Sequence, residues 1–389
     1  MKGKKEYNSN IFYYALLILA CIFGVFYAKF VYFSDTPLHT LVSQVILFQD
    51  VEVDLAGIME HIYAYPLYHL FQKMLHLLLC VDYNTSAAIL LSMTIVCSAC
   101  LYRKLILMLG EENDSFRYFA DFIALGAVLF NVARCGLNNW RYYSLQCGAN
   151  PFHNPTILFV RPFAIASFIY FIKYINTYKH IGNYKYAILF SILTLLSIAA
   201  KPSYAIVFLP AMGIYTLCYM IQNKDIRFGI IAFVAVLPSL ILLIIQQTWI
   251  PSQIEALDDA YHVSIQFGGS FQLEGIEVLT SSLVTFPVVI LQFRPSLLKK
   301  SPAYFIAVIS LIIGWFEMFF IAFGAGDTSW GYDLAIQFAT VISLAITRKY
   351  NEKPYRKIIN IVAYIVFVYQ VWVGIQYLQK MYTLSQFWF

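Results

Sequence analysis

The chain alternates long apolar runs with short polar connections along its whole length. Most runs hold roughly 16 to 22 residues, close to the ~20 that an α-helix needs to cross a hydrocarbon core. We therefore expect an all-α polytopic membrane protein with one transmembrane domain, residues 1–389, and about 11 to 13 helices. The expected helices lie near residues 11–33, 63–80, 86–102, 117–133, 155–174, 185–200, 202–222, 228–247, 277–293, 303–323, 329–347 and 358–379.

Composition and charge support this class and suggest an orientation. Hydrophobic residues make up 60% of the chain and charged residues 12%, whereas soluble proteins have about one quarter charged residues. The connections at 34–62 and 248–276 contain no Lys or Arg, which indicates the outer face, with the N-terminus in the cytoplasm. The loop 248–276 is long enough to fold over a substrate as a lid. The net charge of +5 follows from cytoplasmic retention of basic residues, and no basic face with interleaved aromatics suggests nucleic acid.

One region conflicts with this orientation. If 63–80 and 86–102 both cross the membrane, Arg103, Lys104 and Arg117 fall on the outer side. A re-entrant or interfacial helix near 63–80 would return them to the cytoplasmic side. The sequence alone leaves both arrangements open.

The first outer loop contains a candidate catalytic carboxylate. The apolar spacing of Leu38, Val42 and Val45 predicts an amphipathic helix on the outer membrane surface. Asp35 stands directly before this helix. A carboxylate at that interface can act as a general base that takes the proton of a hydroxyl group. The alternative is a structural one, in which the side chain of Ser34 or Asp35 caps the helix.

Cations on the same face are candidate ligands for a phosphate group. Arg161 and Lys201 lie in apolar sequence, where an ionisable side chain is costly without a partner. Both could bind phosphate oxygens, or both could extend to the outer headgroups. His39, His69 and His153 belong to the same face and could donate hydrogen bonds to phosphate or hydroxyl groups. Their spacing is not that of a zinc site.

These motifs follow one another in a particular order. The order is Asp35 and His39, Tyr65-Pro66-Leu67-Tyr68-His69, Asn154-Pro155-Thr156, Arg161-Pro162-Phe163, and Lys201-Pro202-Ser203 with Leu209-Pro210-Ala211. Over roughly the first 220 residues, the arrangement resembles the GT-C superfamily of polytopic glycosyltransferases. The resemblance implies a GT-C-like bundle with an outer-face amphipathic helix after the first span.

The resemblance also implies an activity. It implies transfer of a sugar from a polyprenyl-phosphate carrier to a glycan or lipid-linked acceptor, on the outer face of a membrane that short loops suggest is a bacterial inner membrane. Asp35 would be the base, and the substrate-binding residues would be His39, Tyr65, His69, His153, Asn154, Arg161 and Lys201. The second acidic residue of many members is absent after Asp35, so no metal cofactor is favoured. The carboxylates at 50, 52 and 54 leave a divalent cation open.

Two other functions stay open from the sequence. A surface-polysaccharide polymerase also joins lipid-linked sugars, but it would rely on arginine-rich outer loops, and the longest outer loops here have no Arg. A flippase or transporter of a lipid-linked or anionic sugar would use Arg161 and Lys201 to line its translocation path.

Overall fold

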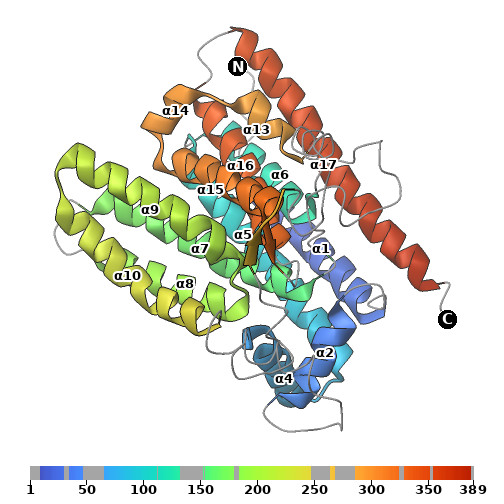
Figure 1. Cartoon of the computed structure of the whole chain (residues 1–389). Helices are drawn as coiled ribbons and strands as arrows, with labels where there is room; N and C mark the ends of the chain where they lie inside the picture. Colours follow the sequence, from blue (N-terminus) through green and yellow to red (C-terminus); the bar gives the residue numbers. More distant parts are fainter. Residues whose placement is uncertain are drawn as a thin grey trace.

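The computed structural model describes residues 9–29, 35–46, 65–111, 113–131, 152, 154–178, 184–246, 263–267, 285–323, 328–350 and 354–386. These residues are almost entirely helical (Figure 1). The elements are α1 (Asn10–Lys29), α2 (Thr36–Val45), α4 (Leu67–Leu79), α5 (Tyr83–Leu109), α6 (Asp114–Leu129), α7 (Pro155–Thr177), α8 (Tyr184–Ala200), α9 (Ser203–Asn223), α10 (Ile226–Ile244), β1 (Val263–Ile265), α13 (Pro287–Gln292), α14 (Pro295–Lys300), α15 (Pro302–Phe320), β2 (Ile321–Phe323), α16 (Thr328–Lys349) and α17 (Pro354–Gln386).

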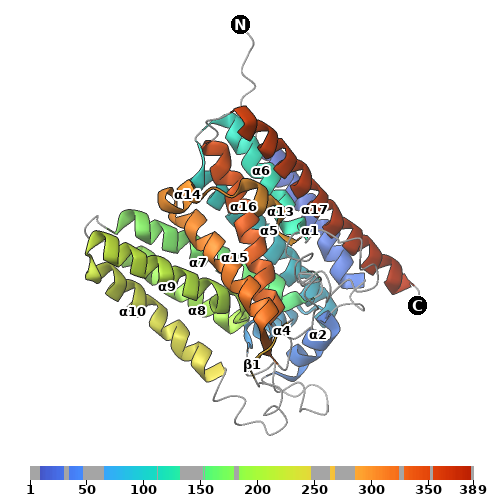
Figure 2. The ribbon, with the colours of Figure 1, turned by 45° about the horizontal axis from the view of Figure 1, so that its top comes forward.

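The described helices confirm an all-α, multi-pass membrane protein. Seven of them, α1, α5, α7, α9, α10, α15 and α17, are long and apolar enough to cross a bilayer. α6, α8 and α16 pack alongside these seven. α16 is buried along most of its length, between α15, α9 and α5, and forms the centre of the bundle (Figures 1 and 2).

The amphipathic helix expected after the first span is present as α2. Its face with Val42, Val45 and Ile46 is buried, and α2 packs on α4 and α5. The next expected span, 63–80, is replaced by the shorter α4. With 13 residues, α4 is about 20 Å long, less than the ~30 Å of a hydrocarbon core. The described part of the region 63–80 is therefore shorter than a full span, as the re-entrant or interfacial alternative expects.

This arrangement places the conflicting basic residues at the same end of the bundle as the N-terminal end of α1. The Arg103 guanidinium lies over the Phe12 ring, 5.1 Å from its centroid, and its Nε is 2.6 Å from Oδ1 of Asp121. At the same end, Nη2 of Arg348 donates to Oγ of Ser115 at 2.9 Å. We call this end the Arg103 end. Arg103, Arg117 and Arg348 thus gather at one end, as the positive-inside rule expects, whereas Lys73 of α4 is buried at the opposite end.

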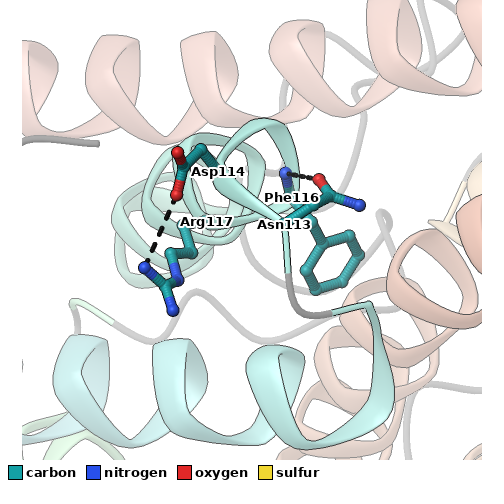
Figure 3. Close-up of polar contacts among 4 residues, drawn as sticks. All are labelled: Asn113, Asp114, Phe116 and Arg117. Atoms are coloured by element: carbon teal, nitrogen blue, oxygen red, sulfur yellow. Dashed lines mark hydrogen bonds and ion pairs between the residues drawn. The ribbon is translucent and has the colours of Figure 1, made fainter. Parts of the chain in front are cut away.

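α6 begins at the Arg103 end with a side-chain cap. Oδ1 of Asn113 accepts a hydrogen bond from the backbone N–H of Phe116 at 2.8 Å, which satisfies one of the free donors of the first turn. Asp114 and Arg117, three residues apart on the surface, form an exposed ion pair at 3.5 Å. Figure 3 shows both contacts. The cap explains why α6 starts here, close to the expected start at 117.

The opposite end of the bundle carries α2, α4 and the strand pair (Figure 2). β1 pairs antiparallel with β2, with Val263 opposite Phe323. β1 is the described part of the expected lid 248–276, together with residues 266 and 267. The remaining lid residues, and residues 47–62 of the first outer loop, lie outside the described residues. Of the expected span 277–293, the described part contains only the six-residue α13, which is too short to cross alone.

Candidate functional site

Asp35 is not a helix cap, although it stands at the N-cap position of α2. Its side chain makes no capping hydrogen bond. Instead, Oδ2 accepts a hydrogen bond of 3.0 Å from Nδ2 of Asn154, a residue 119 positions later in the chain. The half-buried carboxylate is therefore directed toward the start of α7. The alternative in which the Asp35 side chain caps α2 is therefore wrong for this residue.

Asn154 joins this carboxylate to α7. Its Oδ1 caps α7 by accepting hydrogen bonds from the backbone N–H and the Oγ1 of Thr156, at 3.0 and 2.6 Å. Pro155 occupies the first helical position, where its missing N–H costs nothing. Because the amide oxygen is engaged by the cap, the amide nitrogen faces Asp35. The sequence Asn-Pro-Thr thus fixes both the helix start and the donor to Asp35.

The two described histidines form a pair between α2 and α4. Nδ1 of His39 lies 3.0 Å from Nε2 of His69, so one ring donates and the other accepts. Both rings are buried and nearly parallel, 5.3 Å apart. Beside them, Nε2 of Gln72 donates to Oγ1 of Thr40 at 3.2 Å. These polar contacts dock α2 on α4. His153 lies outside the described residues.

Lys201 connects α8 to α9 and is buried, with 2% of its surface exposed. Its Nζ stands 5.3 Å from the ring centroid of Tyr65, at the start of α4. Such a cation–π contact is strongest where the cation is desolvated. A buried ammonium inside the protein does not match the alternative of extension to the outer headgroups.

Arg161 lies two turns inside α7, on the same helix face as Asn154. It is 2% exposed, and its Nη2 is 3.7 Å from Oδ2 of Asp333 in α16. Arg161 is therefore held inside the bundle, about 10 Å from the end of α7 at a rise of 1.5 Å per residue.

The structure brings most of the expected site residues to one end of the bundle, which we call the Asp35 end. α2 and α4 pack together, and the ring of Tyr68, next to His69, lies 5.6 Å from the ring of Phe159 in the first turns of α7. The expected residues at this end are Asp35, His39, Tyr65, His69, Asn154 and Lys201, with Arg161 deeper along α7. They come from α2, α4, α7 and the α8–α9 connection.

Sequence reasoning missed two buried carboxylates. One is Asp333, the partner of Arg161. The other is Glu317, near the end of α15, whose Oε2 has no hydrogen-bond partner within the described ranges. The signal that could have found them is simple, since an acidic residue inside an apolar segment is rare without a function.

The described residues contain no group of three or more His, Cys, Asp or Glu side chains arranged to hold a metal ion. The carboxylates at 50, 52 and 54 lie outside that part of the chain. Neither a protein-family model nor a curated protein matches this sequence.

Proposed function

We propose that this chain is a glycosyltransferase of the membrane, which moves a sugar from a polyprenyl-phosphate carrier to a glycan or lipid-linked acceptor. We infer that the Asp35 end faces the outside of a bacterial inner membrane, because Arg103, Arg117 and Arg348 all lie at the Arg103 end. The observation that carries the proposal is the hydrogen bond from Asn154 to Asp35. It directs a half-buried carboxylate away from its own helix and toward the helix that contains Arg161.

In this proposal, Asp35 is the base. The acceptor hydroxyl attacks the anomeric carbon of the sugar, the carbon–oxygen bond to the phosphate breaks, and its electron pair leaves with the phosphate. Asp35 takes the proton of the attacking hydroxyl. The amide of Asn154 fixes the orientation of the carboxylate, which favours attack from one direction.

The departing phosphate gains negative charge and needs a cation. Arg161 and Lys201 supply it in the proposal. Both are buried, so their attraction for phosphate is weakened less by water than that of a surface residue. The planar guanidinium of Arg161 can bind two phosphate oxygens at once, whereas Lys201 provides a point charge.

The experiment that tests the proposal is Asp35→Asn in reconstituted membranes. The substrates are a panel of undecaprenyl-phosphate-linked hexoses and pentoses, with sugar transfer to lipid or glycan acceptors as the readout. We expect transfer by the wild type and a loss of about 100-fold or more in the variant, with folding and donor binding kept. Asp82→Asn is the matched control, because Asp82 is a carboxylate near α4 whose role is to cap α5. The next residue, Tyr83, accepts a hydrogen bond at its backbone oxygen from Gln72 of α4. Equal transfer by Asp35→Asn and wild type would refute the role of Asp35.

A second candidate function is translocation of an anionic lipid or sugar. It is favoured by the charged pair Arg161 and Asp333 inside the bundle, since such groups often line a transport path. The two functions differ in their dependence on Asp35. If the protein is a transporter, Arg161→Ala blocks movement of the substrate across liposome membranes, and Asp35→Asn leaves it nearly unchanged.

A further inference from the structure

The guanidinium of Arg161 presents one unsatisfied edge inside the protein. Its Nε and Nη2 have no hydrogen-bond partner among the residues that the structure describes. These two nitrogens carry the parallel N–H bonds of one edge of the guanidinium, the geometry that binds two oxygens of one anion. Buried donors without partners are rare and costly in folded proteins. This pair of parallel donors, which we call the fork, is buried and has no acceptor among the described residues. It therefore points to a ligand with two acceptor oxygens.

Asp333 neutralises this cation without filling the fork. Its Oδ2 is 3.7 Å from Nη2, beyond hydrogen-bonding distance, and both side chains are 2% exposed. Oδ2 also lacks a hydrogen-bond partner in the described structure. At this separation the carboxylate lowers the cost of burying Arg161. The two parallel N–H groups stay available to another acceptor.

The position of Asp333 is fixed by close helix packing. Two residues before it, Gly331 lies so near α9 that an added Cβ would stand 2.9 Å from the backbone oxygen of Ser203 and 2.5 Å from the side chain of Val207. Ser203 follows Lys201 by two residues. The first turn of α16 is therefore held against the start of α9, where the second candidate phosphate cation lies.

We propose that Asp333 is a positioning residue that holds Arg161 for one phosphate group. In this arrangement, two phosphate oxygens accept hydrogen bonds from Nε and Nη2, and Asp333 keeps the guanidinium plane and its charge in place. The identity of the ligand as the phosphate of a lipid carrier rests on the proposed function. The proposal that Asp333 positions Arg161 rests instead on the burial of both side chains and on the two Arg161 donors that have no acceptor in the described part of the chain.

The test measures binding to the full chain in detergent, with farnesyl phosphate as the probe and farnesol as the probe without phosphate. We expect wild type to bind farnesyl phosphate at least about tenfold more tightly than farnesol, the effect of a charge-assisted hydrogen bond. Arg161→Lys keeps the charge but not the fork, and weakens farnesyl phosphate binding by about tenfold. Asp333→Asn weakens it by about three- to tenfold, and Asp333→Glu recovers most of the loss. Farnesol binding stays constant throughout.

Two control variants match these changes. Arg103→Lys alters an arginine that already has a carboxylate at 2.6 Å at the other end of the bundle. Asp121→Asn neutralises another buried carboxylate, the partner of Arg103. We expect both to bind farnesyl phosphate as the wild type does. The charge exchange, Arg161→Asp with Asp333→Arg, restores a buried pair and supports folding, but we expect it not to distinguish farnesyl phosphate from farnesol.

The inference is overturned if Asp333→Asn or Arg161→Lys binds farnesyl phosphate as tightly as the wild type, or if the charge exchange does. It is also overturned if the wild type binds both probes equally. Normal sugar transfer by Asp333→Asn, with an unchanged KM for the donor, would overturn the inference and leave the proposed function standing. Selective phosphate binding without transfer from any donor would overturn the proposed function and leave the inference standing.

Discussion

Asn154 has two separable tasks, and substitutions can divide them. Its Oδ1 caps α7 and its Nδ2 donates to Asp35. Asn154→Ala removes both contacts. The cap contributes about 1 kcal/mol, and a hydrogen bond to a charged group about 1.5 kcal/mol. Because Asp35 is half-buried, the second value is reduced by solvent, so we expect the free energy of unfolding to fall by about 2 kcal/mol.

Asn154→Asp keeps the cap and removes the donor. An aspartate caps a helix as well as an asparagine does, and its charge suits the helix N-terminus. The new carboxylate would stand near 3.0 Å from Oδ2 of Asp35. At an effective dielectric constant of 20, the repulsion at this distance is about 5 kcal/mol. Asp35 relieves it by rotating toward solvent. We therefore expect near-normal stability but at least a tenfold loss of sugar transfer, since the base is misplaced.

The assay combines thermal unfolding in detergent, followed by tryptophan fluorescence, with sugar transfer in reconstituted membranes. Asn113→Ala is the matched control, because Asn113 caps α6 with a similar bond at the Arg103 end. It should lower stability by about 1 kcal/mol and leave transfer unchanged. Wild-type transfer by Asn154→Asp, or an equal loss of transfer in Asn113→Ala, would refute the reasoning.

Four further predictions concern orientation, packing and pH dependence. In intact cells, a membrane-impermeant maleimide should label the exposed Cys80 at the Asp35 end in a variant whose other six cysteines are replaced by Ser, and no labelling would reverse the assigned sides. Gly374→Ala should destabilise the protein by about 2 kcal/mol, because its Cβ would meet the backbone oxygen of Leu129 at 1.8 Å. Gly213→Ala, with open space around the added Cβ, should instead stabilise by about 0.5 kcal/mol, and equal unfolding temperatures of the two variants would contradict this account. Hydrogen bonds from Thr85 hold the pKa of Asp82 below its usual range. The contribution of Asp82 to stability is therefore present above pH ~4 and is lost as the pH falls below that. An Asp82→Asn variant that loses as much stability in acid as the wild type would disprove this.

The sequence was sufficient for the membrane class and for most helix positions. Apolar runs predicted α7, α8, α9 and α10 to within a few residues. In lipid the backbone must satisfy its own hydrogen bonds, so an apolar run of sufficient length forms a spanning helix. The distribution of basic residues also favoured a re-entrant or interfacial helix near 63–80, where the structure has the short α4. A run of apolar residues cannot by itself separate a short interfacial or re-entrant helix from a span, and the structure adds that the helix has only 13 residues.

The candidate site was predicted in part. Motif order led to Asp35, Asn154, Arg161 and Lys201, but a sequence carries no information on which side chains meet. The contact between Asp35 and Asn154 joins residues 119 positions apart. Asp333 was missed because its helix was considered only as a span, and the approach of Asp333 to Arg161 depends on how the helices pack. The pairing of His39 with His69 was likewise visible only in the folded chain.

The central claim is that Asp35 and Arg161 serve one pocket that takes a lipid-linked phosphate. The most direct measurement is a structure of the full chain in lipid with a bound undecaprenyl-phosphate-linked sugar. The account predicts phosphate oxygens within hydrogen-bonding distance of Nε and Nη2 of Arg161, with the sugar lying toward the carboxylate of Asp35. A headgroup bound at the Arg103 end, or on a face of the bundle remote from both residues, would contradict it.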